Sequence, residues 1–207
     1  MENIGYWDKK YEYISRSTIE YDNWLDTFDD EITKCRTSIL DLGCGDGSNT
    51  LALLEKCKQV IPCDASVNAI SNIIRNFPEV ETAKRLNFMY HLPYMDDTFD
   101  MIVADQSLHY FNDYFTKRIL FNIKRVLKQN GTLLFRVNSI NDKNYMQDFV
   151  KALDKHFYLN EEGLNVRYFS LEEIYSFFGN GNVEYLEEEN LEKDGKQKTL
   201  WKGCIRY

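Results

Sequence analysis

A short apolar segment that runs directly into closely spaced glycines constrains the fold of this chain most. Residues 37–42 have the character of a short strand, and Gly43-Cys44-Gly45-Asp46-Gly47 follows at once. Closely spaced glycines permit positive φ angles and let a ligand approach the backbone, and the helix expected next offers unpaired N–H groups. This order predicts the first unit of an open α/β sheet, with a ligand at the carboxyl end of the strand.

Strand-like and helix-like segments alternate after this loop. Apolar runs typical of strands lie at 60–64, 86–90, 99–104 and 132–137. Between them, apolar residues recur at helical spacing after the glycine loop, after Ser66 and most regularly over 113–127. Alternating strands and helices predict a parallel sheet covered on both faces. We therefore expect an α/β fold with a doubly wound, mostly parallel, seven-stranded sheet.

The two ends of the chain add further elements. Residues 13–34 present one apolar helical face, which predicts a helix before the first strand. The chain closes with two strand-like runs, 183–189 and 199–207, around a polar turn at 194–196. These runs predict a C-terminal antiparallel hairpin.

The segment after the fifth strand favours helices. Asp142 is suited to cap a helix that carries Tyr145, Phe149 and Leu153 on one side. Ser170-Leu171-Glu172-Glu173 has the form of a capping box, which predicts a second short helix.

The overall charge limits the class of partner. The 207-residue chain has a formal net charge of −8, whereas binding a nucleic-acid backbone requires clustered Lys and Arg. We therefore expect a small-molecule substrate and no nucleic acid. The five cysteines form no CxxC pair, which is typical of reduced thiols. The first residues lack a signal pattern, and no apolar run approaches the ~20 residues of a membrane span, so a cytoplasmic protein without a membrane partner is expected.

Two carboxylates beside the glycine loop narrow the choice of ligand. Asp41 stands two residues before Gly43, where a fold that binds dinucleotides usually presents an apolar residue. A carboxylate there suits a ligand with an ammonium group and opposes a pyrophosphate. Asp64 ends the second predicted strand, where a carboxylate accepts hydrogen bonds from ribose hydroxyls; its alternative role is a charge at the helix N-terminus that follows.

Three segments together resemble class I S-adenosylmethionine-dependent methyltransferases. Ile39-Leu-Asp-Leu-Gly-Cys-Gly-Asp-Gly47 resembles motif I of that family. Leu92-Pro-Tyr-Met-Asp-Asp-Thr-Phe-Asp100 resembles the stretch that leads into its fourth strand, and Ser107-Leu-His-Tyr-Phe111 resembles the segment that follows. The resemblance covers roughly residues 37–138. It implies a single domain, 1–207, with a helical lid or cap (1–36), a cofactor-binding core (37–138), a variable acceptor-side region (139–182) and the terminal hairpin (183–207).

The resemblance also implies roles for particular residues. The methionine part of S-adenosylmethionine would lie at Asp41, Gly43 and Gly45, and Cys44 between the glycines would also bind the cofactor. The ribose and adenine would lie at Asp64 and Ala65, the adenine edge at Asn87, Phe88 and Met89, and the sulfonium end at Asp105, Gln106 and Ser107. Many family members carry an Asp in the adenine segment, and this chain has none there, so the side-chain oxygen of Asn87 or a backbone group is expected to serve. No metal is expected, and S-adenosylhomocysteine is the implied product.

Methyl transfer mainly requires alignment of the nucleophile and exclusion of water. A base is needed only where the acceptor loses a proton, and His109 is the best candidate because a neutral imidazole is available near pH 7. The alternative is a structural histidine. Tyr6, Trp7 and Tyr11 belong to an N-terminal segment similar to one that covers the active site in many small family members; the alternative is a hydrophobic anchor.

The methyl acceptor itself is left open by the sequence. Asp105-Gln106-Ser107-Leu108 is not the Asn-Pro-Pro-Tyr signature of enzymes that methylate adenine or amide nitrogens. Aromatic residues of the variable region are candidates for the acceptor pocket or for plain core: Tyr145, Phe149, Phe157, Tyr158, Tyr168 and Phe169. Two other functions remain, a non-catalytic protein that binds S-adenosylmethionine and an NAD-dependent oxidoreductase, and Asp41 and the terminal hairpin argue against the second.

Overall fold

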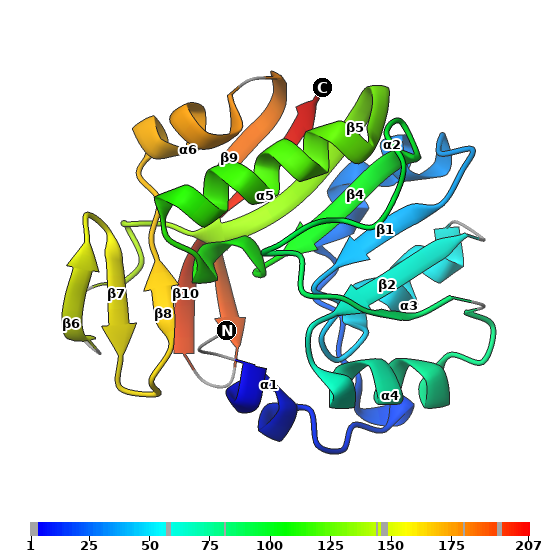
Figure 1. The fold of residues 1–207 in the computed structure, drawn as a ribbon, viewed down its shortest axis with the longest axis horizontal. Helices are drawn as coiled ribbons and strands as arrows, with labels where there is room; N and C mark the ends of the chain where they lie inside the picture. The colour runs from blue at the N-terminus through cyan, green and yellow to red at the C-terminus, as the bar shows by residue number, and fades with distance from the viewer. Residues whose placement is uncertain are drawn as a thin grey trace.

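The main sheet of the computed structural model has seven strands in the order β3-β2-β1-β4-β5-β10-β9. The structure describes residues 4–56, 59–80, 82–143, 145, 149–179, 181–193 and 196–207. The strands are β1 (Ile39–Leu42), β2 (Val60–Asp64), β3 (Lys84–Arg85), β4 (Phe99–Asp105), β5 (Leu127–Asn138), β9 (Asn182–Lys193) and β10 (Lys196–Arg206). β1 to β5 are parallel, and β10 runs antiparallel to both β5 and β9. The predicted sheet and its terminal hairpin are confirmed (Figure 1).

Helices cover both faces of this sheet. They are α1 (Ile4–Lys10), η1 (Arg16–Thr18), η2 (Trp24–Phe28), α2 (Asp29–Thr33), α3 (Ser48–Lys56), α4 (Val67–Asn76), η3 (Leu108–Tyr110), α5 (Asp113–Val126) and α6 (Leu171–Phe178). The side chains of Ser66 and Ser170 cap α4 and α6, and the second forms the predicted capping box with Glu173.

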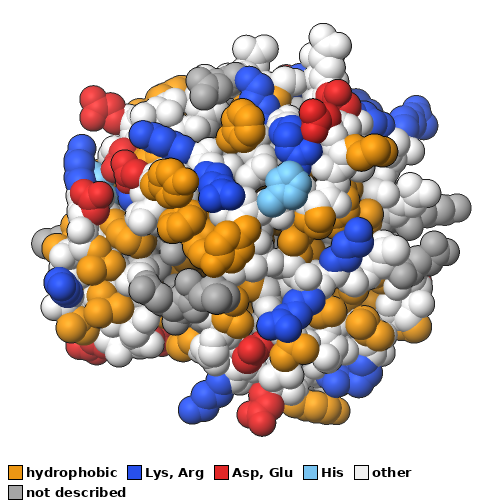
Figure 2. Space-filling model, viewed as in Figure 1, with side chains coloured by type: hydrophobic (Ala, Val, Ile, Leu, Met, Phe, Trp, Pro, Cys, Tyr) orange, Lys and Arg blue, Asp and Glu red, His pale blue; other side chains and the backbone are white. Residues whose placement is uncertain are grey.

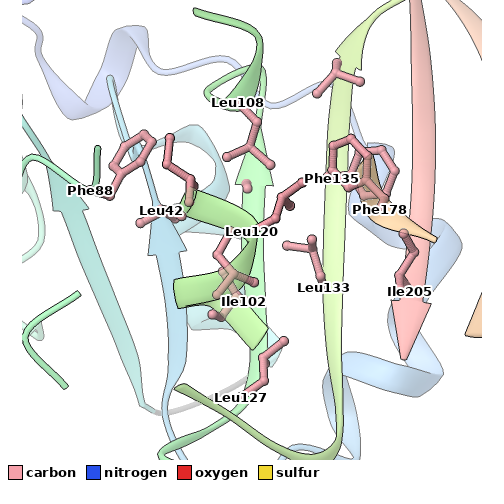
Figure 3. Packing of buried hydrophobic residues seen from close by; sticks show 14 of the residues in the cluster. Leu42, Phe88, Ile102, Leu108, Leu120, Leu127, Leu133, Phe135, Phe178 and Ile205 are labelled. Carbon is pink, nitrogen blue, oxygen red and sulfur yellow. The ribbon is translucent and has the colours of Figure 1, made fainter. Parts of the chain in front are cut away.

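Alternation along the strands divides the core into two layers. Leu42 and Ile102 pack with α5 and α6, together with Leu133 and Phe135 (Figure 3). The residues at the alternate positions of these strands, such as Ile39 in β1 and Met101 in β4, pack with η2, α2 and α3 on the other face. Because successive side chains of a strand point to opposite faces, Asp41 lies on the α3 side, and this placement decides its environment.

Two predicted elements before β4 differ from the observed ones. The stretch 13–34 contains only η1, η2 and α2. Asn23 has a left-handed φ of 62°, and the Tyr21 hydroxyl accepts the backbone N–H of Leu25, so a continuous helix is interrupted there. The third strand is β3 rather than 86–90, because the Asn87 side chain accepts the backbone N–H of Met89 and turns the chain.

The helix predicted after Asp142 is wrong over 149–154. That stretch is a strand, β6 (Phe149–Asp154), which pairs with β7 (Phe157–Asn160), and β8 (Asn165–Arg167) completes a separate antiparallel sheet. The Asp142 carboxylate accepts the backbone N–H of Thr199 in β10 instead of capping a helix. Phe149 stacks on Tyr158 at 4.0 Å between ring centroids, a cross-strand contact that a helix lacks. Residues 194 and 195 of the predicted polar turn lie outside the described part.

Candidate active site

One cavity of about 940 Å³ lies at the carboxyl ends of β1, β2 and β4. Its other walls come from α1, η3, β7 and β8, so the cavity extends from the main sheet toward the small sheet of β6, β7 and β8. Fifteen of the sixteen residues proposed from the sequence line it, and the exception is Asp41. A parallel sheet brings the loops after its strands to one edge, which is why segments far apart in the sequence meet here.

The glycine loop brings its backbone against the cavity. Gly43 and Gly45 have φ angles of 83° and 50°. A Cβ on Gly43 would lie 2.6 Å from the Cβ of Ser107, and one on Gly45 would lie 2.6 Å from the Tyr11 hydroxyl oxygen. Both backbone conformations favour glycine, and at Gly43 the close Ser107 Cβ also leaves no space for a side chain.

Asp41 lies beneath this loop rather than in the cavity wall. Its side chain is fully buried, Oδ2 accepts a hydrogen bond of 2.6 Å from the Thr50 hydroxyl, and Oδ1 has no hydrogen-bond partner within the described chain. Burial is the largest cause that raises its pKa to about 7; the Thr50 hydrogen bond opposes this shift, and the nearby carboxylates of Asp105, Asp64 and Asp46 add to it. A buried carboxylate with a free oxygen provides negative potential below the loop, which suits a cation above it.

Asp64 joins the glycine loop to the start of α4. Its Oδ2 accepts the backbone N–H of Gly45 at 3.1 Å, and its Oδ1 accepts that of Ser66 at 2.8 Å. Burial nevertheless raises its pKa. Asp64 and Ala65 both line the cavity, so the carboxylate is held where the ribose was predicted.

The adenine segment has one side-chain oxygen already in use. The Oδ1 atom of Asn87 accepts the N–H of Met89 at 3.1 Å, and this favours a backbone group as the partner of the adenine amino group. The Phe88 ring contacts Phe111 edge-on at 5.6 Å between centroids. Asn87, Phe88 and Met89 all line the cavity.

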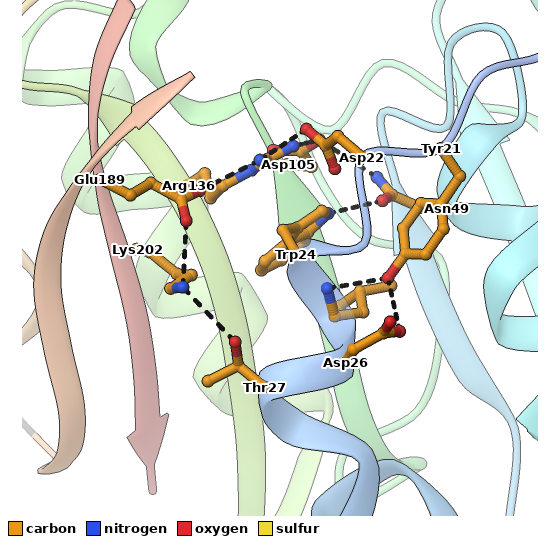
Figure 4. A network of polar contacts seen from close by, with 11 residues as sticks. Tyr21, Asp22, Trp24, Asp26, Thr27, Asn49, Asp105, Arg136, Glu189 and Lys202 are labelled. Carbon is orange, nitrogen blue, oxygen red and sulfur yellow. Dashed lines mark hydrogen bonds and ion pairs between the residues drawn. The ribbon is translucent and has the colours of Figure 1, made fainter. Parts of the chain in front are cut away.

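A buried arginine holds the carboxylate at the end of β4. Arg136 donates from Nε and Nη2 to the two oxygens of Asp105, at 2.7 and 2.8 Å, and from Nη1 to Asp22 and Glu189, at 2.7 and 3.1 Å (Figure 4). Its guanidinium also lies over the Trp24 ring, 4.7 Å from the centroid. This bidentate geometry fixes the orientation of Asp105 at the cavity.

The next two predicted residues continue the cavity wall. The Ser107 hydroxyl donates to the backbone oxygen of Leu42 at 2.8 Å and thereby ties the end of β4 to the glycine loop. Gln106 has a φ of 48° and also lines the cavity.

His109 lies in η3 beside the end of β5. The residue is 1% exposed, and Nδ1 accepts the backbone N–H of Asn138 at 3.3 Å. Burial lowers its pKa well below the usual value, and the positive charge of Lys198 lowers it further. His109 is therefore a neutral imidazole in the wall of the cavity.

The N-terminal segment lies across the cavity and is attached on two sides. Asp8 accepts hydrogen bonds from the Ser66 hydroxyl and the Val67 N–H, at 2.7 and 2.9 Å, at the start of α4. On the other side, the Tyr6 hydroxyl donates to Glu162, which follows β7, at 3.1 Å. Tyr6, Trp7 and Tyr11 of this segment line the cavity together with the buried Cys44 of the glycine loop.

Several functional positions were not predicted from the sequence. Arg136 is one of them. A single arginine within an apolar strand could have indicated a buried ion pair, because an unpaired buried charge is costly. Asn138 and Lys198 also line the cavity, and their strands bring them there from distant parts of the chain. Of the six aromatic candidates, Phe157 and Tyr168 line the cavity, whereas Phe169 belongs to the core.

Comparisons with known proteins agree with this geometry. A family profile described as a methyltransferase domain matches residues 40–135. The uncharacterized methyltransferase YcgJ of Bacillus subtilis is 26% identical over 73% of this chain and 60% of its own length. The tRNA N(3)-cytidine methyltransferase METTL2 of Danio rerio is 25% identical over 81% of this chain and 52% of its own length. The chain thus spans little more than half of these two relatives.

A solved structure extends the similarity to the whole fold. The N-methyltransferase NodS of Bradyrhizobium japonicum, in complex with S-adenosylhomocysteine, superimposes with a TM-score of 0.69 at 13% identity, and the match covers 100% of this chain and 98% of NodS. The fold, the glycine loop and the methyltransferase domain matched over residues 40–135 are those of class I, Rossmann-like S-adenosylmethionine-dependent methyltransferases. S-adenosylmethionine is accordingly its cofactor.

The residues present fit this cofactor. S-adenosylmethionine carries a sulfonium and an ammonium group, and the cavity lining has six carboxylates against two lysines: Asp46, Asp64, Asp105, Asp142, Glu161, Glu162, Lys10 and Lys198. The unpaired Oδ1 of Asp41 adds negative potential beneath the loop. The residues of this cavity would bind and orient the cofactor, whose sulfonium would supply the activated methyl group.

Across the part of the chain that the structure describes, no group of three or more His, Cys, Asp or Glu side chains is placed to hold a metal ion. None of the described helices has the length and apolar character to cross a membrane.

Proposed function

We propose that the protein transfers the methyl group of S-adenosylmethionine to a small-molecule acceptor by in-line displacement. The observation that carries this proposal is a covered cavity of about 940 Å³ with an acidic lining. This volume lies near the upper end of the range for small-molecule sites, about 300–1,000 Å³, so a cofactor and a modest acceptor fit together. The acidic lining suits a cationic donor and repels a polyanionic acceptor.

The elements around the cavity have distinct tasks in this proposal. The glycine loop and the carboxylates near it hold the cofactor, with Asp41 acting on the ammonium group through its field or through one bridging water, because the carboxylate is fully buried. Asp105, fixed by Arg136, faces the sulfonium end. α1 acts as a lid, held by Asp8 and Tyr6, and excludes water from the reacting atoms.

One surface feature favours a second candidate function, methylation of a nucleic acid. The outward face of α5 carries the exposed rings of Tyr114 and Phe121, 65% and 69% accessible, and the exposed basic residues Lys117, Arg118 and Lys124 between and beyond them. Figure 2 shows basic and hydrophobic side chains alternating on this face. Aromatic rings interleaved with cations suit a single-stranded nucleic acid, and the relative METTL2 is named for a tRNA target.

Two measurements test these proposals. Thermal shift with S-adenosylhomocysteine, S-adenosylmethionine and NAD at matched concentrations tests the cofactor, and stabilisation by NAD alone contradicts the proposal. Production of S-adenosylhomocysteine is then measured with a panel of small amines, thiols and phenols and, separately, with total tRNA. Turnover with tRNA that is lost in Lys117→Glu/Arg118→Glu favours the second function. Cofactor binding without turnover on either panel identifies a non-catalytic binding protein.

A further inference from the structure

The cavity has an acceptor end beyond the cofactor-binding residues. We define this end by the lining residues of η3, β7 and β8, which are His109, Tyr110, Phe157, Asn160, Asn165 and Val166. Tyr110 separates His109 from the lid, because its ring contacts His109 at 4.5 Å and Trp7 at 5.1 Å between centroids. His109 therefore shares this end with aromatic, aliphatic and amide side chains, and Lys198 of β10, which also lines the cavity, is near enough for its charge to act on the imidazole.

The hydrogen bond to β5 fixes which nitrogen of His109 carries the proton. The backbone N–H of Asn138 is a donor only, so Nδ1, 3.3 Å away, must offer its lone pair. A neutral imidazole has one protonated and one unprotonated nitrogen, which places the proton on Nε2. The ring is buried, and the positive charge of Lys198 in β10 acts on it. Burial and this charge both oppose the addition of a second proton to the imidazole.

This arrangement removes the proton-accepting role predicted for His109. Nδ1 is engaged with β5, and Nε2 already carries hydrogen, so neither nitrogen is free to take a proton from an acceptor. The ring nitrogen left for a ligand in the cavity is a donor.

We propose, on the basis of the function above, that His109 is a fixed hydrogen-bond donor of the acceptor end and selects acceptors with a carbonyl oxygen, an anionic oxygen or a ring nitrogen beside the methylated atom. The nucleophile reacts as a free base or anion: its lone pair forms the new bond to carbon, and the electrons of the S–CH₃ bond return to sulfur. Where an amine reacts, the resulting ammonium product loses its proton to water rather than to His109.

The tautomer is tested directly by ¹⁵N NMR of the imidazole nitrogens in the protein saturated with S-adenosylhomocysteine. The chain has three histidines, and His109→Gln assigns the signals of interest by their loss. We expect Nε2 protonated, Nδ1 unprotonated and no change between about pH 5.5 and pH 8.5, a range that spans the ordinary histidine pKa of about 6.5. A proton on Nδ1, or titration to the imidazolium within this range, overturns the proposal.

Donation to a ligand is tested with two small probes of nearly the same shape. Acetophenone carries a carbonyl oxygen, and α-methylstyrene has a methylene group in its place. Acetophenone is expected to shift the Nε2–H signal of His109 and to bind at least about threefold more tightly than α-methylstyrene, and His109→Phe is expected to remove this preference. Equal binding of the two probes, or a preference that persists in His109→Phe, contradicts the donor role.

A control separates this inference from the proposed function. S-adenosylhomocysteine should stabilise His109→Gln and His109→Phe against heat as it stabilises the parent protein. If the parent does not bind S-adenosylhomocysteine, the proposed function fails; if binding is normal and the tautomer or the probe preference is wrong, only the role of His109 fails. If His109→Phe does not fold, His109→Gln and the NMR of the parent decide the question.

Discussion

Replacing Asp41 by Asn should make the unliganded protein more stable and its cofactor binding weaker. Burial raises the pKa of Asp41 from 3.8 to about 7, and each pKa unit corresponds to about 1.4 kcal/mol. Ionised Asp41 therefore costs the folded state on the order of 4 kcal/mol above pH 7. Asn has nearly the same shape, and its amide oxygen can accept the Thr50 hydroxyl that now donates to Asp41, so the variant removes the charge and keeps the contact.

The pH dependence of this gain follows from the sign of the shift. Because the folded state holds the Asp41 proton more tightly than the unfolded chain, the contribution of Asp41 to stability is full below about pH 4 and is lost as the pH rises through about 7. The advantage of Asp41→Asn should therefore be small near pH 4.5 and reach roughly 2–4 kcal/mol at pH 8. Urea unfolding at both pH values measures it.

Asp100, whose pKa is lowered rather than raised, provides the control. The Lys128 ammonium and the N–H groups of Arg36 and Thr37 outweigh burial and hold the pKa of Asp100 at about 2. Asp100→Asn should therefore destabilise the protein by about 2 kcal/mol at pH 8, and this loss should shrink as the pH falls toward 2. If Asp41→Asn is the less stable protein at pH 8, with an unchanged dependence on urea, the reasoning about the buried charge is refuted.

Asp41→Asn should bind the cofactor more weakly even though it is the more stable protein. Removing the charge beneath the loop should weaken S-adenosylhomocysteine at pH 8 by about tenfold, since a water that bridges the ammonium group and this carboxylate makes charge-assisted hydrogen bonds, each worth about 1.5–3 kcal/mol. In the parent protein, affinity should fall as the pH drops below about 7, because Asp41 then takes up a proton, and in Asp41→Asn this dependence should be absent. Calorimetric titration at both pH values checks both statements.

Three further substitutions test the elements around the site. Asp8→Ala removes two hydrogen bonds at the start of α4 and should weaken S-adenosylhomocysteine severalfold, whereas the exposed Glu12→Ala should not; equal affinities in calorimetry contradict the lid. Arg136→Met leaves Asp105 without its buried partner and should cost about 3–5 kcal/mol in urea unfolding, and a loss below about 1 kcal/mol shows that the ion pair adds little. Gly45→Ala places a methyl group against Tyr11 at a positive φ and should reduce both stability and cofactor affinity, with a normal affinity by thermal shift contradicting close backbone approach.

Short sequence motifs predicted the main sheet and its helix caps. The features that the sequence did not predict depend on contacts between residues far apart in the chain. The glycine loop, the α4 cap at Ser66 and the capping box at Ser170 lie within a few neighbouring residues, so the sequence displays them. The prediction of a helix after Asp142 was wrong because the Asp142 carboxylate accepts a hydrogen bond from the backbone N–H of Thr199, 57 positions along the chain. The ion pair of Arg136 with Asp105 spans 31 positions, and nothing in the sequence pairs the two residues.

The electrostatics of the site fit the role that we propose for the buried carboxylate of Asp41. A neutral residue at this position would favour the unliganded fold, so we propose that the charge serves the bound state. Arg136 compensates the negative charge of Asp105 and leaves Asp41 uncompensated, because the two oxygens of Asp105 are occupied by the guanidinium while Oδ1 of Asp41 has no partner within the described chain. A cation above the loop relieves this imbalance. The free energy of cofactor binding and the free energy of unfolding are therefore coupled through the Asp41 side chain. The stability gained when the cofactor binds should be larger in the parent protein than in Asp41→Asn, by about the binding free energy that the variant loses.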